Sequence, residues 1–162
     1  MTDDTPVDLV AAHRHFSAWC FNQAWDLMEK SERTEADDRL MVALNQASIF
    51  HWMRRPDCAA RNLSIGYWQA SRIQALLANA PEAMRHAQTC LDYSTTLEPF
   101  YVGYAYEALA RAAGLANDVV ARAEYLAKAE ALAAQVPNED GRRLLTADLE
   151  QLRAPDGRDV TG

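Results

Sequence analysis

Several features are scarce or missing in this chain of 162 residues, whose length suits one domain with its own core. Runs of Val, Ile and Thr are absent, so strands have little support. The cysteines Cys20, Cys58 and Cys90 are odd in number and lack paired spacing, which argues against a disulfide framework. No apolar run approaches the roughly 18 residues of a membrane span, and residues 1–6 contain neither the basic nor the apolar region of a signal peptide. We therefore expect a cytoplasmic protein with reduced thiols that contacts no membrane.

Charge and motifs exclude further classes of protein. The net charge is −7, whereas nucleic-acid binders usually carry a basic face, so no nucleic acid is expected as a partner. Nothing in the sequence resembles a P-loop, a Gly-rich dinucleotide turn or a nucleophile elbow. We expect no enzymatic activity, no catalytic residue and no cofactor.

What the chain does contain is alanine, with 30 copies against 6 each of glycine and proline. Alanine is the best helix former, and polar or proline-containing breaks recur at regular intervals. These signals predict an all-α fold of seven helices joined by short links, so that consecutive helices form antiparallel hairpins. The helices are expected over residues 7–30, 34–55, 58–77, 80–93, 99–116, 118–135 and 138–152.

The first predicted helix carries two apolar stripes. One stripe has the 3–4 spacing of a core face. It comprises Leu9, His13, Phe16, Cys20, Ala24 and Leu27. The second stripe, Phe21, Trp25 and Met28, lies about 100–160° away around the helix. This helix therefore needs neighbours on two sides or carries an exposed apolar stripe.

Capping residues mark several of the predicted helix ends. Thr34 begins the second helix with Asp37 as the acid of a capping box, and Asp57 is expected to cap the third. The core face of the second helix is predicted to hold Leu40, Ala43, Leu44, Ala47 and His51. In the last helix, an inner stripe of Leu145, Leu149 and Leu152 opposes a polar outer face that includes Asp148.

The chain contains a weak internal repeat with an offset of 39 residues. This offset places Tyr67 on Tyr106, Ser71 on Ala110 and Arg72 on Arg111. Few of the aligned residues are identical, but size and polarity follow position in both copies. Two helices per unit of 30–50 residues predict a solenoid of helical hairpins.

Each of these units resembles a tetratricopeptide repeat (TPR), because an aromatic residue precedes a small one by four positions in the first helix. These pairs are Tyr67-x-x-x-Ser71 and Tyr106-x-x-x-Ala110, and their partner helices carry Ala83-x-x-x-Ala87-x-x-Cys90 and Leu126-x-x-Ala129. The resemblance implies a right-handed α-α superhelix of about three antiparallel helix pairs with a C-terminal capping helix. It makes residues 1–153 one TPR-like domain and residues 154–162 a flexible tail. The chain departs from TPRs in its period, in the longer link after the first helix and in Arg122, which stands where a small residue is expected.

A TPR-like fold implies a concave groove lined by the first helix of each pair. The whole chain is also similar to small uncharacterised bacterial TPR-like proteins, from which no activity carries over. On this resemblance the partner-binding residues are Phe21, Trp25, Ile65, Trp68, Arg72, Tyr104, Glu107 and Arg111. The aromatic side chains suit a protein or peptide partner, and the arginines suit a carboxylate or acidic motif. A purely structural interpretation is that the aromatics pack against residues 31–36 or the last helix, and that Arg72 and Arg111 pair with an acid such as Glu107.

The sequence supports two further hypotheses and contains one pair of possible metal ligands. A small-molecule-binding protein or enzyme would use a pocket around His51, Trp52, Trp68 and Arg72, in which His51 responds to pH. A homodimer would use the stripe of Phe21, Trp25 and Met28 as its interface. The pair His86 and Cys90 shares a helix face, but a zinc site needs three or four ligands and no metal motif supports one, so no metal is expected.

Overall fold

The computed structural model describes residues 6–153, and this part of the chain is helical with no strand. The helices are α1 (Leu9–Met28), α2 (Glu35–Met53), α3 (Ala60–Leu76), α4 (Ala80–Ser94), α5 (Pro99–Leu115), α6 (Val119–Ala133) and α7 (Glu139–Arg153). The all-α class and the seven predicted helices are confirmed. The predicted flexible tail, residues 154–162, lies outside the described residues.

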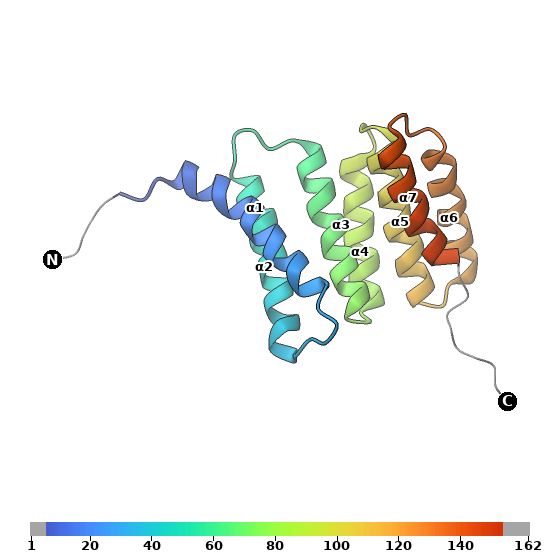
Figure 1. Cartoon of the computed structure of the whole chain (residues 1–162), viewed down its shortest axis with the longest axis horizontal. Coiled ribbons are helices and arrows are strands. Elements are labelled where there is room, and N and C mark those ends of the chain that lie inside the picture. The colour runs from blue at the N-terminus through green and yellow to red at the C-terminus, as the bar shows by residue number, and fades with distance from the viewer. Residues whose placement is uncertain (1–5, 154–162) are drawn as a thin grey trace.

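The helices form a row of packed pairs that runs from α1–α2 to α6–α7 (Figure 1). Within the row, α1 packs on α2, α3 on α4 and α5 on α6. The pairs are joined because α3 also contacts α1 and α5, and α5 contacts α7. The odd-numbered helices therefore follow one another along one side, and residues on their outer faces share one surface.

The turns inside the second and third pairs are built identically, 39 residues apart. Ala78 and Asn117 have left-handed backbones, with φ of 57° and 59°. The next residues, Asn79 and Asp118, donate their N–H groups to carbonyls five positions back, both at 2.9 Å, and their side chains cap α4 and α6. This left-handed turn with a six-residue hydrogen-bonded ring is a common helix C-terminus. The repeat is thus more regular in the backbone than in the sequence.

One of the two capping predictions is confirmed and the other is wrong. Thr34 and Asp37 form the predicted capping box at the start of α2. Asp57 does not cap α3, so that prediction is wrong. Its carboxylate is held by Arg55, at 2.6 and 2.8 Å, and the Asn62 side chain instead accepts the N–H of Ala59 at the N-terminus of α3. An arginine two residues away competes successfully for the aspartate because the charged pair is the stronger interaction.

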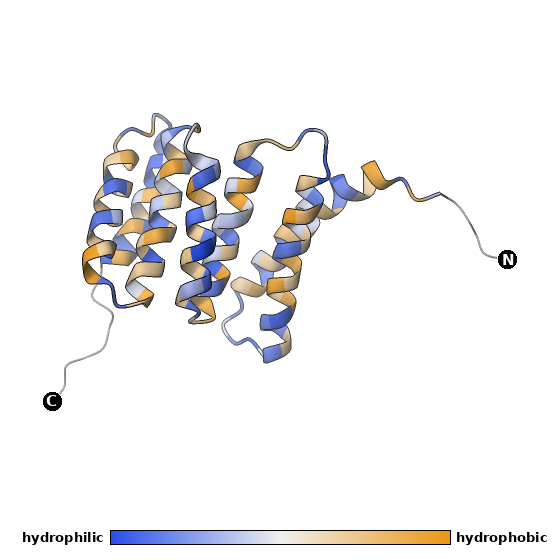
Figure 2. Cartoon of the chain, turned by 180° about the vertical axis from the view of Figure 1, so that it is seen from behind, coloured by the Kyte–Doolittle hydropathy of each residue, from blue (hydrophilic) through white to orange (hydrophobic). Residues whose placement is uncertain are grey.

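The core consists of three clusters along the row, one for each group of neighbouring helices. The first centres on Ala24, Met41 and Ile73 between α1, α2 and α3, and the second on Ala87, Ala108 and Leu109. The third contains Ala129, Ala133, Val136, Leu145 and Leu149, against which Phe100, Tyr104, Tyr106 and Leu126 pack. Apolar and polar stripes alternate along the helices when the row is seen from behind (Figure 2). Such segmented packing is expected where each unit contacts only its neighbours.

The predicted core face of α2 is right only in part: Leu44 packs against the cluster of Ala24, Met41 and Ile73, but the fully buried face is displaced by about one position. Leu40 is 51% exposed, whereas the buried residues are Met41, Asn45, Ser48 and Ile49. Burial of the two polar side chains is possible because both are hydrogen-bonded. Asn45 donates to the Gly66 carbonyl and to Gln69, at 3.1 and 3.0 Å, and Ser48 donates to the Ser17 carbonyl at 2.7 Å. Apolar periodicity alone does not reveal such a face.

The core stripe of α1 holds only in its second half. Cys20 and Ala24 are buried, but Leu9 is 63% and Phe16 39% exposed, because the N-terminal half of α1 projects from the row (Figure 1). The stripe of Leu145, Leu149 and Leu152 on α7 is buried as predicted.

Candidate functional site

Five aromatic rings form a continuous row across α1, α3 and α5. Phe21 stacks on Trp25, with ring centroids 6.4 Å apart, and Trp25 stacks on Trp68 at 5.8 Å. The Trp68 ring meets Tyr104 edge to face at 5.5 Å, and Tyr104 meets Phe100 in the same way at 5.1 Å. Spacings of four residues in α1 and α5 place the members of each helix on one face. The row is therefore a product of helix periodicity and of the side-by-side packing of the odd-numbered helices.

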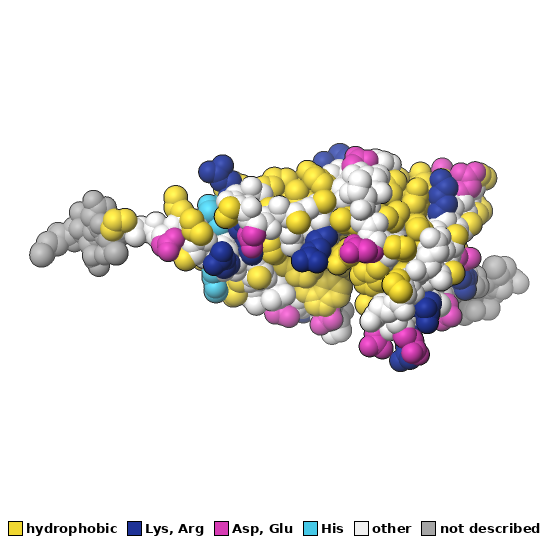
Figure 3. Space-filling model, turned by 90° about the horizontal axis from the view of Figure 1, so that it is seen from above, with side chains coloured by type: hydrophobic (Ala, Val, Ile, Leu, Met, Phe, Trp, Pro, Cys, Tyr) yellow, Lys and Arg dark blue, Asp and Glu magenta, His cyan; other side chains and the backbone are white. Residues whose placement is uncertain are grey.

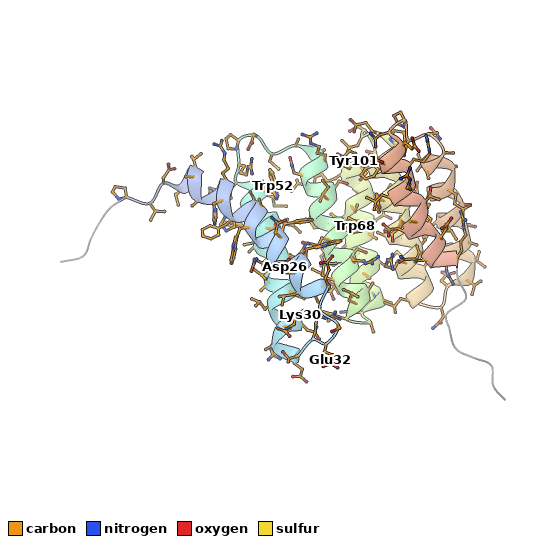
Figure 4. The ribbon with its side chains drawn as sticks, viewed as in Figure 1. Asp26, Lys30, Glu32, Trp52, Trp68 and Tyr101 are labelled. Atoms are coloured by element: carbon orange, nitrogen blue, oxygen red, sulfur yellow. The ribbon has the colours of Figure 1, made fainter. Side chains whose placement is uncertain are left out.

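This row lines a groove of about 520 Å³, which we call the aromatic groove. Its walls also include α7. Between the α1–α2 end and the α7 end of the molecule the surface is hollowed, and hydrophobic side chains gather there (Figure 3). Trp68, halfway along α3, and Tyr101, near the start of α5, lie in the space between α1 and α7 (Figure 4). The lining residues are Phe21, Asn22, Trp25, Ser64, Ile65, Trp68, Arg72, Phe100, Tyr101, Tyr104, Leu144 and Asp148. The groove is thus mainly apolar and aromatic, with charged groups from α3 and α7.

Glu107 is the hub of a buried polar network beneath this groove. Its side chain is 1% exposed, and one carboxylate oxygen accepts the indole N–H of Trp68 at 2.9 Å. The other oxygen accepts two N–H groups of Arg111, one of them at 3.1 Å. Trp68 and Glu107 are 39 residues apart, so equivalent positions of the two repeats bind each other. Glu107 therefore holds the indole N–H of Trp68 from beneath, and the indole ring of Trp68 faces the groove.

Arg72 is less well paired than Arg111. Its Nη1 atom lies 3.8 Å from the Glu107 carboxylate, is buried and makes no hydrogen bond. Burial lowers the pKa of the Arg72 guanidinium, as does the nearby charge of Arg111, while Glu107 and Asp148 oppose this shift. A quarter of the side chain remains exposed. Arg72 thus stays a partly buried cation whose charge is incompletely neutralised.

Tyr104 is anchored to the last helix. Its hydroxyl donates to the Asp148 carboxylate at 2.7 Å. Burial, together with this bond and the charge of Asp148, raises the pKa of Tyr104. The phenol of Tyr104 therefore remains protonated and fixed in position. Helix α7 thus forms one wall of the groove and also covers the end of the row of helices.

A second cavity of about 340 Å³ adjoins the aromatic groove and shares Arg72 with it. We call it the arginine pocket, because Arg72, Arg111 and Arg122 line it and no residue of 6–153 contributes a carboxylate to its lining. The remaining wall is formed by Ala75, Leu76, Ala110, Gly114, Leu115, Asn117, Gln151 and Leu152.

Most of the predicted binding residues lie together. Phe21, Trp25, Ile65, Trp68, Arg72 and Tyr104 line the aromatic groove. Arg111 lines the arginine pocket, and Glu107 is buried under both cavities rather than exposed to a partner. The predicted pairing of the arginines with Glu107 is found for Arg111 and, more weakly, for Arg72. The structural interpretation is right for part of the aromatic row, because Phe100 and Tyr104 pack against the cluster that includes Leu145 and Leu149 of α7. Phe21, Trp25 and Trp68 instead stack on one another, and no residue of 31–36 lines the groove.

The alternative pocket is not assembled. His51 lies beside His13, with 2.8 Å between their Nδ1 atoms, and its ring also neighbours Phe16. Burial and His13 lower the pKa of His51. Trp52 lies near the end of α2 under the guanidinium of Arg55 and lines a separate hollow of about 140 Å³ (Figure 4). Neither side chain lines the groove that holds Trp68 and Arg72.

The proposed dimer stripe is also divided. Met28 packs against the cluster of Ala24, Met41 and Ile73, so it belongs to the core and not to an exposed face. Phe21 and Trp25 instead face the aromatic groove. The angle of about 100–160° between the two apolar stripes of the first helix does not show that Met28 lies in the core while Phe21 and Trp25 face the groove.

Six groove residues were not predicted from the sequence: Asn22, Ser64, Phe100, Tyr101, Leu144 and Asp148. Phe100 and Tyr101 could have been found, since they precede Tyr104 by one helical turn. Asp148 was assigned to the polar outer face of α7, which is wrong, because it faces the groove and binds Tyr104. No periodicity argument identifies the face of a terminal helix that borders a groove.

His86 and Cys90 are held by other partners. Cys90 lies 3.8 Å from the Ser64 hydroxyl and 4.0 Å from that of Ser94, and His86 stacks on Tyr67. Across residues 6–153, no three His, Cys, Asp or Glu side chains come together as metal ligands would. No helix in this range combines the length and apolar character that crossing a membrane requires.

No protein-family model matches the chain, and no curated protein or solved structure shows significant similarity to it.

Proposed function

We propose that the chain is a non-catalytic, TPR-like interaction module that binds a segment of a protein partner in the aromatic groove. In this proposal α1–α6 form three antiparallel pairs of a right-handed superhelix, and α7 is its capping helix. The packing of each odd-numbered helix on the next supports this architecture, as do the equivalent turns at Ala78 and Asn117. A cytoplasmic setting agrees with Cys20, Cys58 and Cys90, which are unpaired.

The observation that carries the proposal is the aromatic row in an open, apolar groove. Tryptophan and tyrosine dominate the binding energy of many interfaces, because they bury large rigid surfaces while keeping a polar tip. The Trp68 and Tyr104 tips are already bonded, to Glu107 and Asp148, so their rings are fixed before a partner arrives. Preorganised side chains lose little entropy on binding.

The same bonds argue for binding rather than catalysis. A general acid or base must be free to exchange a proton with its substrate. Glu107 already accepts hydrogen bonds from Trp68 and Arg111, and Asp148 accepts one from Tyr104. The groove therefore offers shape and apolar contact, which suit an extended or helical peptide with an apolar anchor.

Selection of random 12-residue peptides displayed on phage tests the proposal. We expect enrichment of peptides with aromatic or aliphatic anchors. We also expect Leu144→Glu, which places a charge on the groove wall, to weaken their binding about 10-fold or more. Leu40→Glu is the matched control, since Leu40 on α2 is 51% exposed and Leu144 56%.

The result is decided by comparing the two variants in a titration that follows tryptophan fluorescence. Loss of binding in Leu144→Glu with retention in Leu40→Glu supports the groove. Failure to enrich any peptide, or equal binding by both variants and the unmodified chain, would contradict it. Circular dichroism of each variant establishes that the helices are intact.

A further inference from the structure

The arginine pocket has three guanidinium groups in its lining but no carboxylate from residues 6–153. Arg111 and Arg72 both face Glu107, a single carboxylate that also accepts the Trp68 indole. Arg122 donates to the Leu152 carbonyl, which is a neutral acceptor. Around this cavity of about 340 Å³, Arg72 and Arg111 therefore share one buried carboxylate, and Arg122 pairs with no carboxylate of residues 6–153.

Arg72 shows where the imbalance lies. Its Nη1 atom is buried without a hydrogen bond, although a buried cationic donor without a partner is costly. Burial and the charge of Arg111 both lower the pKa of this guanidinium. A negative group in the pocket would relieve the repulsion between Arg72 and Arg111 and restore the balance of charge.

The pocket wall strengthens such an interaction. Alanine and leucine side chains from α3 and α5 form much of it, and Asn117 and Gln151 add neutral polar groups. A low local dielectric increases the attraction between opposite charges. Guanidinium groups are planar forks that match the two oxygens of a carboxylate, so paired arginines favour this group.

We infer that the arginine pocket is a carboxylate-binding subsite that holds an acidic side chain of the peptide whose apolar anchor lies in the aromatic groove. The inference deepens the proposed function and rests on it. Arg72 lines both cavities, so the acidic group and the apolar anchor lie on either side of this residue. The partner segment accordingly combines an apolar side chain with a nearby Asp or Glu.

The subsite is tested first without any peptide, with glutarate as the probe. Thermal unfolding is compared in sodium glutarate and in sodium chloride at equal ionic strength and pH. A ligand at about ten times its Kd raises Tm by roughly 3 °C in a chain of this size. We expect this rise in the unmodified chain, its loss in Arg72→Gln and a smaller rise in Arg72→Lys, which keeps the charge but not the fork.

The matched control is Arg33→Gln. The Arg33 side chain is 18% exposed and pairs with Asp38, so it resembles Arg72 in burial and partner but lies in the link between α1 and α2. This variant should keep the glutarate effect. Equal stabilisation of the unmodified chain and Arg72→Gln overturns the subsite. Because no peptide is used, this result is independent of whether the aromatic groove binds one.

The second arm uses the peptides selected on phage. Replacing their acidic side chain by the amide should weaken binding about 10- to 100-fold, the loss expected for a hydrogen-bonded charge. An amidated C-terminus should leave binding unchanged, and the opposite pattern would assign the pocket to a terminal carboxylate.

If neither change matters and Arg72→Gln binds as the unmodified chain does, the inference is wrong even though the groove binds peptides. If glutarate binds and no peptide is enriched, the proposed function fails while the carboxylate site stands.

Discussion

Glu107→Gln is the substitution that tests the buried network most directly. The carboxylate accepts from Trp68 through one oxygen and from Arg111 through the other. Glutamine has the same size but only one acceptor oxygen, and its NH₂ group would face a donor. Either the indole or the guanidinium is then left without an acceptor, and Arg111 and Arg72 lose their shared counter-charge.

The expected cost follows from the burial of the pair. Removing one partner of a buried ion pair costs about 3–5 kcal/mol, because the remaining charge stays buried. For a chain of this length, 1 kcal/mol corresponds to about 2–4 °C in Tm, so Tm should fall by roughly 6–20 °C. The helical signal at low temperature should be unchanged, because the helices do not depend on Glu107 for their own hydrogen bonds.

Urea denaturation followed by circular dichroism and by tryptophan fluorescence measures this cost. Glu124→Gln is the control, since Glu124 is exposed on α6 and should change the free energy of unfolding by no more than about 0.5 kcal/mol. If Glu107→Gln is as mild as Glu124→Gln, the carboxylate does not hold the network together. The preorganisation of Trp68 in the proposed function would then lose its basis.

The other predictions concern stability and pH. Gly103→Ala should lower the free energy of unfolding by about 1–3 kcal/mol in urea, because the added Cβ would lie 2.6 Å from a Leu145 methyl carbon. Ala78→Gly should raise it by about 1 kcal/mol, since Ala78 has a φ of 57°, whereas Ala147→Gly in the middle of α7 should lower it by about 1 kcal/mol. Burial, followed by the charge of Arg85, lowers the pKa of His86 from 6.5, so below about pH 6.5 the unfolded chain binds a proton that the folded chain does not. The free energy of unfolding should therefore fall as pH decreases from 6.5, less steeply in His86→Phe, as urea titrations at successive pH values would measure.

The number and class of the helices could be predicted because their signals are local. Proline, Asx caps and polar breaks punctuate the chain, and the alanine content favours helices between them. The buried face of α2 could not be predicted in the same way. Asn45 and Ser48 are buried because their partners, Gly66, Gln69 and Ser17, come from α3 and α1. Partners so distant in sequence are visible only once the helices are packed.

The part of the candidate groove that comes from the two repeat copies could be predicted. The offset that aligns Trp68 with Glu107 and Arg72 with Arg111 also placed these residues in equivalent helices. What the offset cannot give is the contribution of α7, which has no counterpart in the repeat. Asp148 and Leu144 were missed for this reason, and Asp148 was placed on the wrong face.

One departure from the 39-residue repeat lies at the arginine pocket. Arg122 stands at the position that Ala83 has in the preceding copy, and its Cδ would lie 3.2 Å from a Cβ added at Gly114. The absence of a side chain at Gly114 therefore gives Arg122 room against α5, from which it reaches the Leu152 carbonyl at the end of α7. The small Gly114 and the large Arg122 therefore still pack closely, as a small and a large apolar residue would, but the large side chain carries a charge. Since deviations from a packing pattern tend to occur at functional sites, this exchange supports the assignment of the pocket to an acidic ligand.

Gly114→Ala should displace Arg122 and weaken the glutarate effect while leaving the aromatic groove intact, and an unchanged glutarate effect would show that Arg122 is not part of the subsite.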